Sequence, residues 1–210
     1  MKLMGITFNL ALKDGEYLVK LARRSIEAKF IGEEANISDA PPVTKKECGV
    51  FVTLNKIKGA GKTLRGCIGY PTPNKPLVEA VREVAQAAAF EDPRFPELSR
   101  SELQNTLIEV SVLTPPEIIK VNKPDQYPSK ITIGADGLIV KKGFRSGLLL
   151  PQVAPEWNWG PEEFLSQCCV KAGLPPDSWL HKDTEISKFQ AIIFTEKTPD
   201  GEIVREEISN

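Results

Sequence analysis

The residues whose types could support chemistry lie closest together in Leu64–Gly69, which holds an arginine, a cysteine and two glycines. Alternate residues of a regular strand share a face and lie about 6.6 Å apart, so Arg65 and Cys67 are expected to project together. A guanidinium at that distance would favour the thiolate and lower the pKa of Cys67. Glycine in a strand often marks a place where a ligand comes close to the backbone. We therefore predict Cys67 as a candidate nucleophile, and Arg65, Gly66 and Gly69 as candidate ligand-binding residues.

A structural interpretation of the same segment stays open. Cys67 would then be a buried free thiol, and a carboxylate elsewhere in the fold would hold Arg65. The two glycines would allow a helix to pack closely on the strand. Buried free cysteines are common, so the residues alone favour this interpretation.

A second candidate segment is Asp92–Pro96, which reads Asp-Pro-Arg-Phe-Pro. Its two prolines restrict the backbone and make the loop stiff. A stiff loop can line a binding site, so we add Asp92 and Arg94 to the candidate ligand-binding residues. The alternative is a turn that ends a helix, in which Asp92 pairs with Arg94 and Phe95 fills the core.

Three further segments have structural interpretations that the residues favour. Gly59–Thr63 resembles a phosphate-binding loop, but Lys56 occupies the position of the first glycine and no helix follows, so a hairpin turn is expected. Trp157 and Trp159 could form a recognition surface, but they are expected to close a hydrophobic core. A catalytic role for His181 is not favoured, because no motif around it indicates a paired nucleophile.

Composition excludes several functional classes. A single histidine and four cysteines without Cys-x-x-Cys spacing cannot build the common zinc sites, so we expect no metal, no cofactor and free thiols in a reducing compartment. Lys+Arg is 27 and Asp+Glu is 28, a formal net charge of -1, which argues against a nucleic-acid partner and leaves RNA binding as a third, weaker hypothesis. The sequence shows neither a secretory pattern nor a long apolar run, which predicts a cytoplasmic protein without a membrane span.

Hydrophobic periodicity predicts two similar sets of elements. In chain order, the first half is expected to have a helix over 14–30, strands over 49–55 and 63–70, a helix over 76–90 and a strand over 106–113. The second half is expected to have strands over 131–133, 138–142 and 147–150, a helix from Pro161 to Gly173, and a final strand over 189–195. Asp14 and Asn74 are expected to cap helices, and Ser99–Glu102 fits a capping box.

These patterns predict an α+β fold with an antiparallel sheet, helices and two strand-strand-helix-strand units. The units would form sub-lobes over about 1–117 and 118–196 of one domain. Residues 197–210 are polar and are expected to form a peripheral tail.

The string LRGCIG at Leu64–Gly69 resembles the signature of the AMMECR domain family. The resemblance extends to DPRFP at Asp92–Pro96, EVSVLTPPE at Glu109–Glu117, GLLLPQVA at Gly147–Ala154 and the helix end at Lys171–Leu174. It covers about Glu16 to Glu196. It implies an α+β fold with two repeated halves and a cleft between unequal lobes. It implies no activity, but it suggests a pathway shared with a Memo-type protein and a radical S-adenosylmethionine (SAM) enzyme.

Two functions follow as hypotheses. In the first, Arg65 anchors a small anionic ligand or a partner's carboxylate in the cleft, with Gly66 and Gly69 permitting close approach. In the second, Cys67 is the nucleophile of an enzyme, and Asp92 or Glu109 transfers protons. The missing histidine beside Cys67 favours the binding protein.

Overall fold

The computed structural model describes residues 10–59 and 61–206. Its helices are α1 (Leu12–Lys29), α2 (Leu77–Phe90), α3 (Arg100–Leu103), α4 (Val153–Glu156) and α5 (Pro161–Lys171). Its strands are β1 (Val50–Lys58), β2 (Gly61–Tyr70), β3 (Thr106–Leu113), β4 (Glu117–Ile118), β5 (Gly137–Lys142), β6 (Arg145–Leu149), β7 (Glu185–Phe189), β8 (Ala191–Glu196) and β9 (Ile203–Glu206). The fold is therefore α+β, as predicted.

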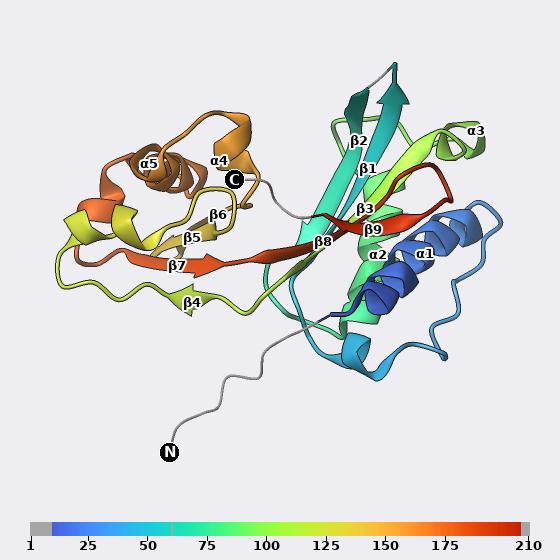
Figure 1. Cartoon of the computed structure of the whole chain (residues 1–210), viewed down its shortest axis with the longest axis horizontal. Helices are drawn as coiled ribbons and strands as arrows, with labels where there is room; N and C mark the ends of the chain where they lie inside the picture. Colours follow the sequence, from blue (N-terminus) through green and yellow to red (C-terminus); the bar gives the residue numbers. More distant parts are fainter. Residues whose placement is uncertain (1–9, 60, 207–210) are drawn as a thin grey trace. The chain divides into compact units, whose positions relative to one another are not determined.

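The elements form two compact units. Unit 1 comprises the described residues up to Val112 together with Ile192–Glu206, and unit 2 includes Leu113–Ala191. Unit 1 contains a five-stranded sheet in the order β2-β1-β3-β8-β9, and unit 2 contains a four-stranded sheet in the order β4-β7-β5-β6. In Figure 1, helices α1 and α2 lie against the sheet of unit 1.

The predicted repeat is present in the connectivity. Strands β1 and β2 pair antiparallel, α2 follows, and β3 returns to the other side of β1. Strands β5 and β6 likewise pair antiparallel, α5 follows, and β7 returns to the other side of β5. The two strand-strand-helix-strand sets therefore share one strand order. The cleft between lobes stays a prediction.

The core of unit 1 explains why its elements form where they do. Val50, Val52 and Leu54 alternate along β1 and are fully buried. Ile108 and Val110 repeat this pattern on β3, so one sheet face buries apolar side chains beneath the helices. The buried face of α2 contributes Leu77, Val81, Val84, Ala85 and Ala88. The alternate face of the sheet carries the polar residues of the candidate site.

Three predictions about local structure need correction. Asp14 lies inside α1 at its third position, where its carboxylate accepts a hydrogen bond from the Ala11 N–H at 2.9 Å. Asn74 does not cap α2, because the residue before that helix is Pro76 and no side chain caps it. Residues 131–133 form no strand, because the Thr132 carbonyl accepts the N–H groups of Ala135 and Asp136 in a local turn. The capping box Ser99–Glu102 is confirmed.

The C-terminal part of the chain also differs from the prediction. The apolar run expected as one final strand divides at Gln190 into β7 of the four-stranded sheet and β8 of the five-stranded sheet. Ile203–Glu206, expected in a peripheral tail, forms strand β9, and Ile203 joins the core of unit 1. An alternating pattern of four residues was too short to predict this strand. Residues 207–210 lie outside the described part of the chain.

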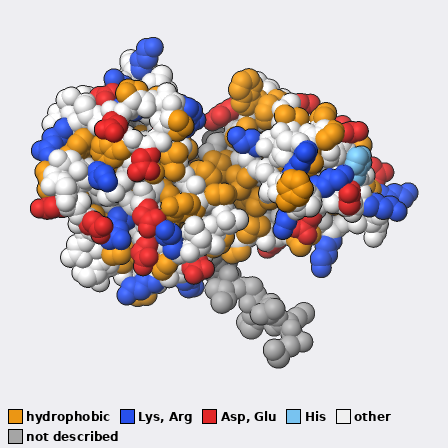
Figure 2. Space-filling view, turned by 180° about the vertical axis from the view of Figure 1, so that it is seen from behind, with side chains coloured by type: hydrophobic (Ala, Val, Ile, Leu, Met, Phe, Trp, Pro, Cys, Tyr) orange, Lys and Arg blue, Asp and Glu red, His pale blue; other side chains and the backbone are white. Residues whose placement is uncertain are grey.

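Within residues 10–59 and 61–206, no helix is both long and apolar enough to cross a membrane. Charged side chains of both signs are interspersed on the face drawn in Figure 2. That face shows no continuous basic surface of the kind that binds nucleic acid.

Candidate functional site

A β-bulge at Arg65 determines how the signature segment is arranged. Leu54 of β1 pairs with Gly66, whereas Asn55 pairs with Leu64, so Arg65 is an extra residue without a partner on β1. A bulge interrupts the alternation of side chains along a strand. The prediction that Arg65 and Cys67 share a face is therefore wrong. The residues that surround each of the two side chains confirm this.

Arg65 is held by its own chain on the helix side of the sheet. Its Nε donates to Glu102 Oε1 at 3.2 Å, and its Nη2 donates to Glu102 Oε2 at 3.2 Å and to the Pro96 carbonyl at 2.9 Å. The guanidinium also lies 5.7 Å from the centre of the Phe95 ring. Its side chain is only 7% exposed. Arg65 thus joins β2 to α3 and to the segment before α3, and a carboxylate holds it as the structural interpretation expected.

Cys67 projects from the opposite face, where it begins a polar row across three strands. The Thr53 hydroxyl on β1 donates to Cys67 Sγ at 3.3 Å, and Thr53 pairs in turn with Glu109 on β3. Cys67 is half-buried. Burial raises the pKa of the Cys67 thiol, although the Thr53 hydroxyl and the charge of Arg94 act in the opposite direction. Burial therefore favours the neutral thiol over the thiolate.

Asp92 and Arg94 complete the outer edge of β2. Strand β2 is the first strand in its sheet, so the outward N–H and C=O of Cys67 have no neighbouring strand. The Asp92 carboxylate accepts the Cys67 N–H at 2.8 Å, and Arg94 Nη2 donates to the Cys67 carbonyl at 3.2 Å. Two side chains thus replace the backbone of a further strand. These contacts explain why the segments Leu64–Gly69 and Asp92–Pro96 are found in the same sequence.

The Asp92–Arg94 pair is tightly organised. Asp92 Oδ1 accepts Arg94 Nε at 2.9 Å, and Oδ2 accepts Arg94 Nη2 at 2.7 Å. The Arg94 guanidinium and the backbone N–H of Cys67 hold the pKa of Asp92 well below its usual range. Asp92 is buried, whereas the Arg94 side chain is 53% exposed. An arginine held in one orientation therefore points partly to solvent beside Cys67.

The two glycines of the segment are required by packing inside unit 1. A Cβ at Gly66 would overlap the carbonyl oxygen of Ala88 on α2. A Cβ at Gly69 would overlap the ring of Phe51 and the carbonyl oxygen of Val50. Their role as ligand-binding residues stays a prediction, and the space beside each glycine is already filled by the chain.

Glu109 is the buried carboxylate of the polar row. Desolvation raises its pKa, and the nearby Lys62, 3.7 Å from Glu109 Oε2, opposes that shift. Ser111 Oγ lies within hydrogen-bond distance of Glu109 Oε1 at 3.4 Å. The sequence pattern did not single out Thr53, which joins Glu109 to Cys67 in the row. Only the register between β1 and β2 identifies it.

The remaining candidates lie elsewhere. Gly59 is in the turn between β1 and β2, where Lys58 pairs with Gly61, so the hairpin replaces the phosphate-binding loop. Trp157 and Trp159 stack 5.8 Å apart, and Trp157 is 66% exposed, so only Trp159 packs against the core of unit 2. His181 Nδ1 lies 3.0 Å from Lys142 Nζ in unit 2. Among the described residues, no group of His, Cys, Asp or Glu side chains is arranged to hold a metal ion.

Comparison with known proteins identifies the family of this chain. The family model described as AMMECR1 matches residues 19–194. The chain belongs to the AMMECR1 family. Protein PH0010 of Pyrococcus horikoshii is 52% identical over 203 residues, which cover 95% of this chain and 98% of that protein. Protein MJ0810 of Methanocaldococcus jannaschii is 47% identical over 199 residues, covering 95% and 98%.

A crystal structure of an AMMECR1 relative shows the same fold. The structure is that of the P. horikoshii protein PH0010, which its title describes as uncharacterized. It matches with a TM-score of 0.84 at 52% identity, covering 92% of this chain and 97% of that one. The family model gives the family and the crystal structure gives the fold, and the names of these relatives state no activity.

Proposed function

We propose that this AMMECR1 protein binds a small anionic ligand, a carboxylate or a phosphate, at Arg94 beside Cys67. The observation that carries the proposal is the fixed orientation of a half-exposed guanidinium. Asp92 holds Nε and Nη2, and the Cys67 carbonyl takes the other proton of Nη2. Within the described residues Nη1 has no hydrogen-bond partner, so two of the five guanidinium donors are available to an acceptor.

Arg94 replaces Arg65 as the proposed anchor. Arg65 is 7% exposed and already bonded to Glu102, whereas Arg94 presents free donors to solvent. Asp92 and Cys67 contribute by fixing Arg94, which reduces the ordering cost of binding. A charge-assisted hydrogen bond is worth about 1.5–3 kcal/mol, so the ligand would gain roughly tenfold to a hundredfold in affinity from this contact.

The test is a titration of the whole protein with inorganic phosphate, acetate and citrate, followed by NMR of the Cys67 amide and the Arg94 Nε–H. We expect saturable shifts with at least one of these anions, and about a tenfold or greater loss of affinity in Arg94→Gln. Arg82→Gln is the matched control, because Arg82 also pairs with a carboxylate, Glu34, at 3.3 Å. Equal affinity in Arg94→Gln and wild type would reject Arg94 as the anchor.

The polar row favours a cysteine-dependent enzyme as the second candidate. Thr53 donates to Cys67 and pairs with Glu109 in the strand register, and burial raises the pKa of Glu109, which favours its acting as a proton acceptor. Asp92 does not fit that role, because its pKa is lowered and both of its oxygens accept hydrogen bonds. The raised pKa of Cys67 places this function second. Cys67→Ser should retain anion binding and would abolish nucleophilic catalysis.

A Memo-type protein and a radical SAM enzyme stay proposed partners, on the family resemblance alone. Co-purification of the tagged chain with each candidate tests both. Loss of capture in Arg94→Gln, with capture retained in Arg82→Gln, would place the partner's acidic group at the same arginine.

A further inference from the structure

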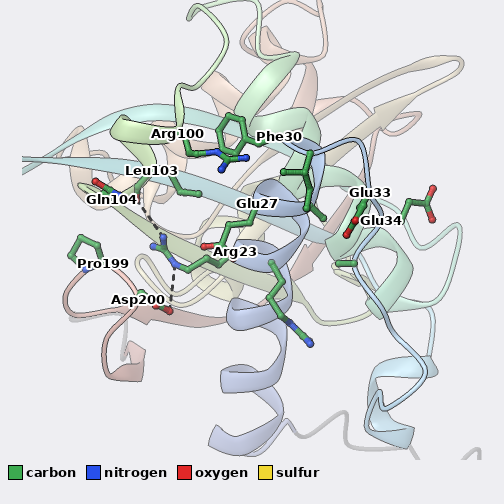
Figure 3. Close-up of a pocket in the computed structure, with 14 residues that line it drawn as sticks. Arg23, Glu27, Phe30, Glu33, Glu34, Arg100, Leu103, Gln104, Pro199 and Asp200 are labelled. Atoms are coloured by element: carbon green, nitrogen blue, oxygen red, sulfur yellow. Dashed lines mark hydrogen bonds and ion pairs between the residues drawn. The ribbon is translucent and has the colours of Figure 1, made fainter.

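Unit 1 has a cavity of about 720 Å³ at the C-terminal end of α1, but its charges select no ligand. Figure 3 shows Arg23 at its centre, with Glu27 on one side and Asp200 on another. Arg24 and Arg100 line the same cavity, so side chains of both signs face it. Polar groups that share one direction lie elsewhere in unit 1, on the outer edge of β2.

The outer edge of β2 presents backbone groups in a fixed register. From Cys67 to Gly69 the strand pairs with β1 without a bulge. In an antiparallel pair, residues alternate between those that bond to the partner strand and those whose N–H and C=O point away from it. The N–H and C=O of Cys67 point outward, because they bond to Asp92 and Arg94. The N–H and C=O of Gly69, two residues further on, therefore point outward too.

Gly69 is the open position of this edge. It is partly exposed, and among residues 10–59 and 61–206 neither its N–H nor its carbonyl has a hydrogen-bond partner. Unpaired backbone groups at a sheet edge can pair with a further strand. At Cys67 the corresponding place is filled by the side chains of Asp92 and Arg94. An added strand can therefore run along Tyr70 and Gly69, and it must end before Cys67.

Arg94 places a positive charge where such a strand would end. Its side chain is 53% exposed, whereas the Asp92 side chain is 2% exposed and both of its oxygens accept hydrogen bonds. Glu109, a further carboxylate whose charge acts on Cys67, has a side chain that is only 10% exposed and pairs with Lys62. The charge that faces solvent beside Cys67 is therefore that of Arg94.

The Tyr70 end of the edge offers no competing positive charge. Lys75 lies 5.1 Å from the centre of the Tyr70 ring, but its Nζ donates to Glu83. Burial and the Glu83 carboxylate raise the pKa of Tyr70, and the negative charge of Glu91 adds to this effect. The two ends of the open edge therefore differ in charge, and an anionic group is favoured only at the Arg94 end.

We propose that this edge binds the C-terminal segment of a peptide chain, with its terminal carboxylate on Arg94 Nη1. The inference rests on the anion site proposed above and names its ligand class. A segment antiparallel to β2 runs from Tyr70 toward Cys67, so it brings its carboxylate to Arg94. A parallel segment would instead bring its positively charged amino end there. Strand addition at a sheet edge and capture of a terminal carboxylate are both established modes of peptide recognition.

The register assigns a contact to each of the last three peptide residues. The last residue lies opposite Ile68, which leaves its carboxylate beside Arg94. The penultimate residue lies opposite Gly69, donates its N–H to the Gly69 carbonyl and accepts the Gly69 N–H. The residue before it lies opposite Tyr70 and directs its N–H away from β2. Binding therefore requires the N–H of the penultimate residue but not the N–H of the residue before it.

The test uses the whole protein and the peptide acetyl-Thr-Val-Thr-Val, as the free acid and as the C-terminal amide. The acid should bind at least tenfold more tightly than either the amide or acetate. Arg94→Gln should remove the difference between acid and amide, and the control Arg82→Gln should keep it. Binding of the acid should also slow hydrogen exchange of the Gly69 amide, which an ionic contact at Arg94 alone would leave unchanged.

N-methylation of the peptide tests the register without altering the protein. The change is made on the peptide because a side chain at Gly69 would overlap the Phe51 ring. A methyl group on the penultimate nitrogen should weaken binding at least tenfold. The same group on the preceding nitrogen is the matched control and should change the affinity by less than about twofold.

The outcomes separate this inference from the anion site on which it rests. Equal affinity of the acid and the amide would show that no terminal carboxylate is recognised, and equal weakening by the two methyl groups would reject the register. If acetate or phosphate binds at Arg94 while the peptide acid binds no more tightly than acetate, the edge is not a peptide site and the anion site stands. If neither the anions nor the peptide bind, the anion site itself is wrong.

Discussion

Arg94, rather than Arg65, is the basic residue that favours the Cys67 thiolate. The charge of Arg94 lowers the pKa of Cys67 against the larger effect of burial, whereas Arg65 is bonded to Glu102 on the helix side. In Arg94→Ala the thiol pKa should rise further, so alkylation at pH 8 should slow several-fold. In Arg65→Ala the pH dependence of Cys67 alkylation should stay as in wild type. Peptide mapping of iodoacetamide-treated protein measures both.

The three buried cysteines provide the internal reference for that experiment. Burial raises the pKa of Cys48 to about 11 and that of Cys168 to about 12, so both should react after Cys67. Fast alkylation of Cys67 below pH 7, abolished in Arg65→Ala, would contradict the arrangement described here. It would also move the cysteine enzyme ahead of the binding protein.

Glu102 is a single residue that makes the free energy of unfolding depend on pH. The Arg65 guanidinium and the Ser99 N–H lower the pKa of Glu102 to about 2, whereas an unfolded glutamate has a pKa near about 4.3. A lowered folded-state pKa stabilises the protein above the unfolded pKa, and this contribution is lost as pH falls from about 5 toward 2. The free energy of unfolding should therefore decline over this window. The decline should be smaller in Glu102→Gln.

Urea unfolding at pH 7, 5 and 3 measures that difference. Glu97→Gln is the control, because Glu97 is exposed in the segment that precedes α3. If Glu102→Gln and Glu97→Gln lose stability equally on acidification, the ion pair with Arg65 contributes nothing to the pH dependence. Asp92 also has a lowered pKa, so it too makes the protein less stable as the pH falls, and it is present in both variants.

At the scale of elements, the close packing of α2 on β2 depends on Gly66. A Cβ there would overlap the Ala88 carbonyl, which is backbone and cannot rotate away. Gly66→Ala should therefore push α2 from the sheet and lower the free energy of unfolding by about 1–3 kcal/mol, as overpacking of cores does. Gly61→Ala is the matched control on the same strand, because its nearest neighbour, the Lys58 carbonyl oxygen, is 3.9 Å away. Equal unfolding midpoints of the two variants would contradict this packing.

The sequence predicts elements better than it predicts the site they build. Periodicity places α1, α2, β1 and β3 because each buries an apolar face at its own period. The bulge at Arg65 depends on pairing with a distant strand, so the alternation of β2 cannot reveal it. The Asp92–Cys67 hydrogen bond likewise joins residues 25 positions apart in the chain. The sequence shows both motifs, Leu64–Gly69 and Asp92–Pro96, but it does not show how they meet in the fold.

At the scale of the whole molecule, unit 1 is built from both ends of the chain. The chain leaves unit 1 after Val112 and returns at Ile192 to add β8 and β9. Prolines that follow β3 lead the sequence to a predicted boundary near residue 117, and the first segment of unit 1 ends at Val112. The sequence does not predict that the chain returns to unit 1 at Ile192. No local pattern shows which of the two sheets a strand near the end of the chain joins.

Ile203 tests this discontinuous organisation. It is 5% exposed in β9 and belongs to the core that includes Leu18 of α1 and Val52 of β1. Ile203→Ala should lower the free energy of unfolding by about 2–5 kcal/mol through the cavity it leaves, whereas Val204→Ala, half-buried on the same strand, should cost much less. Hydrogen exchange should show lost protection in β1 and α1 and unchanged protection in β5 and β7. Loss confined to β9 would instead mean that this strand is peripheral, and uniform loss in both units would mean that they unfold together.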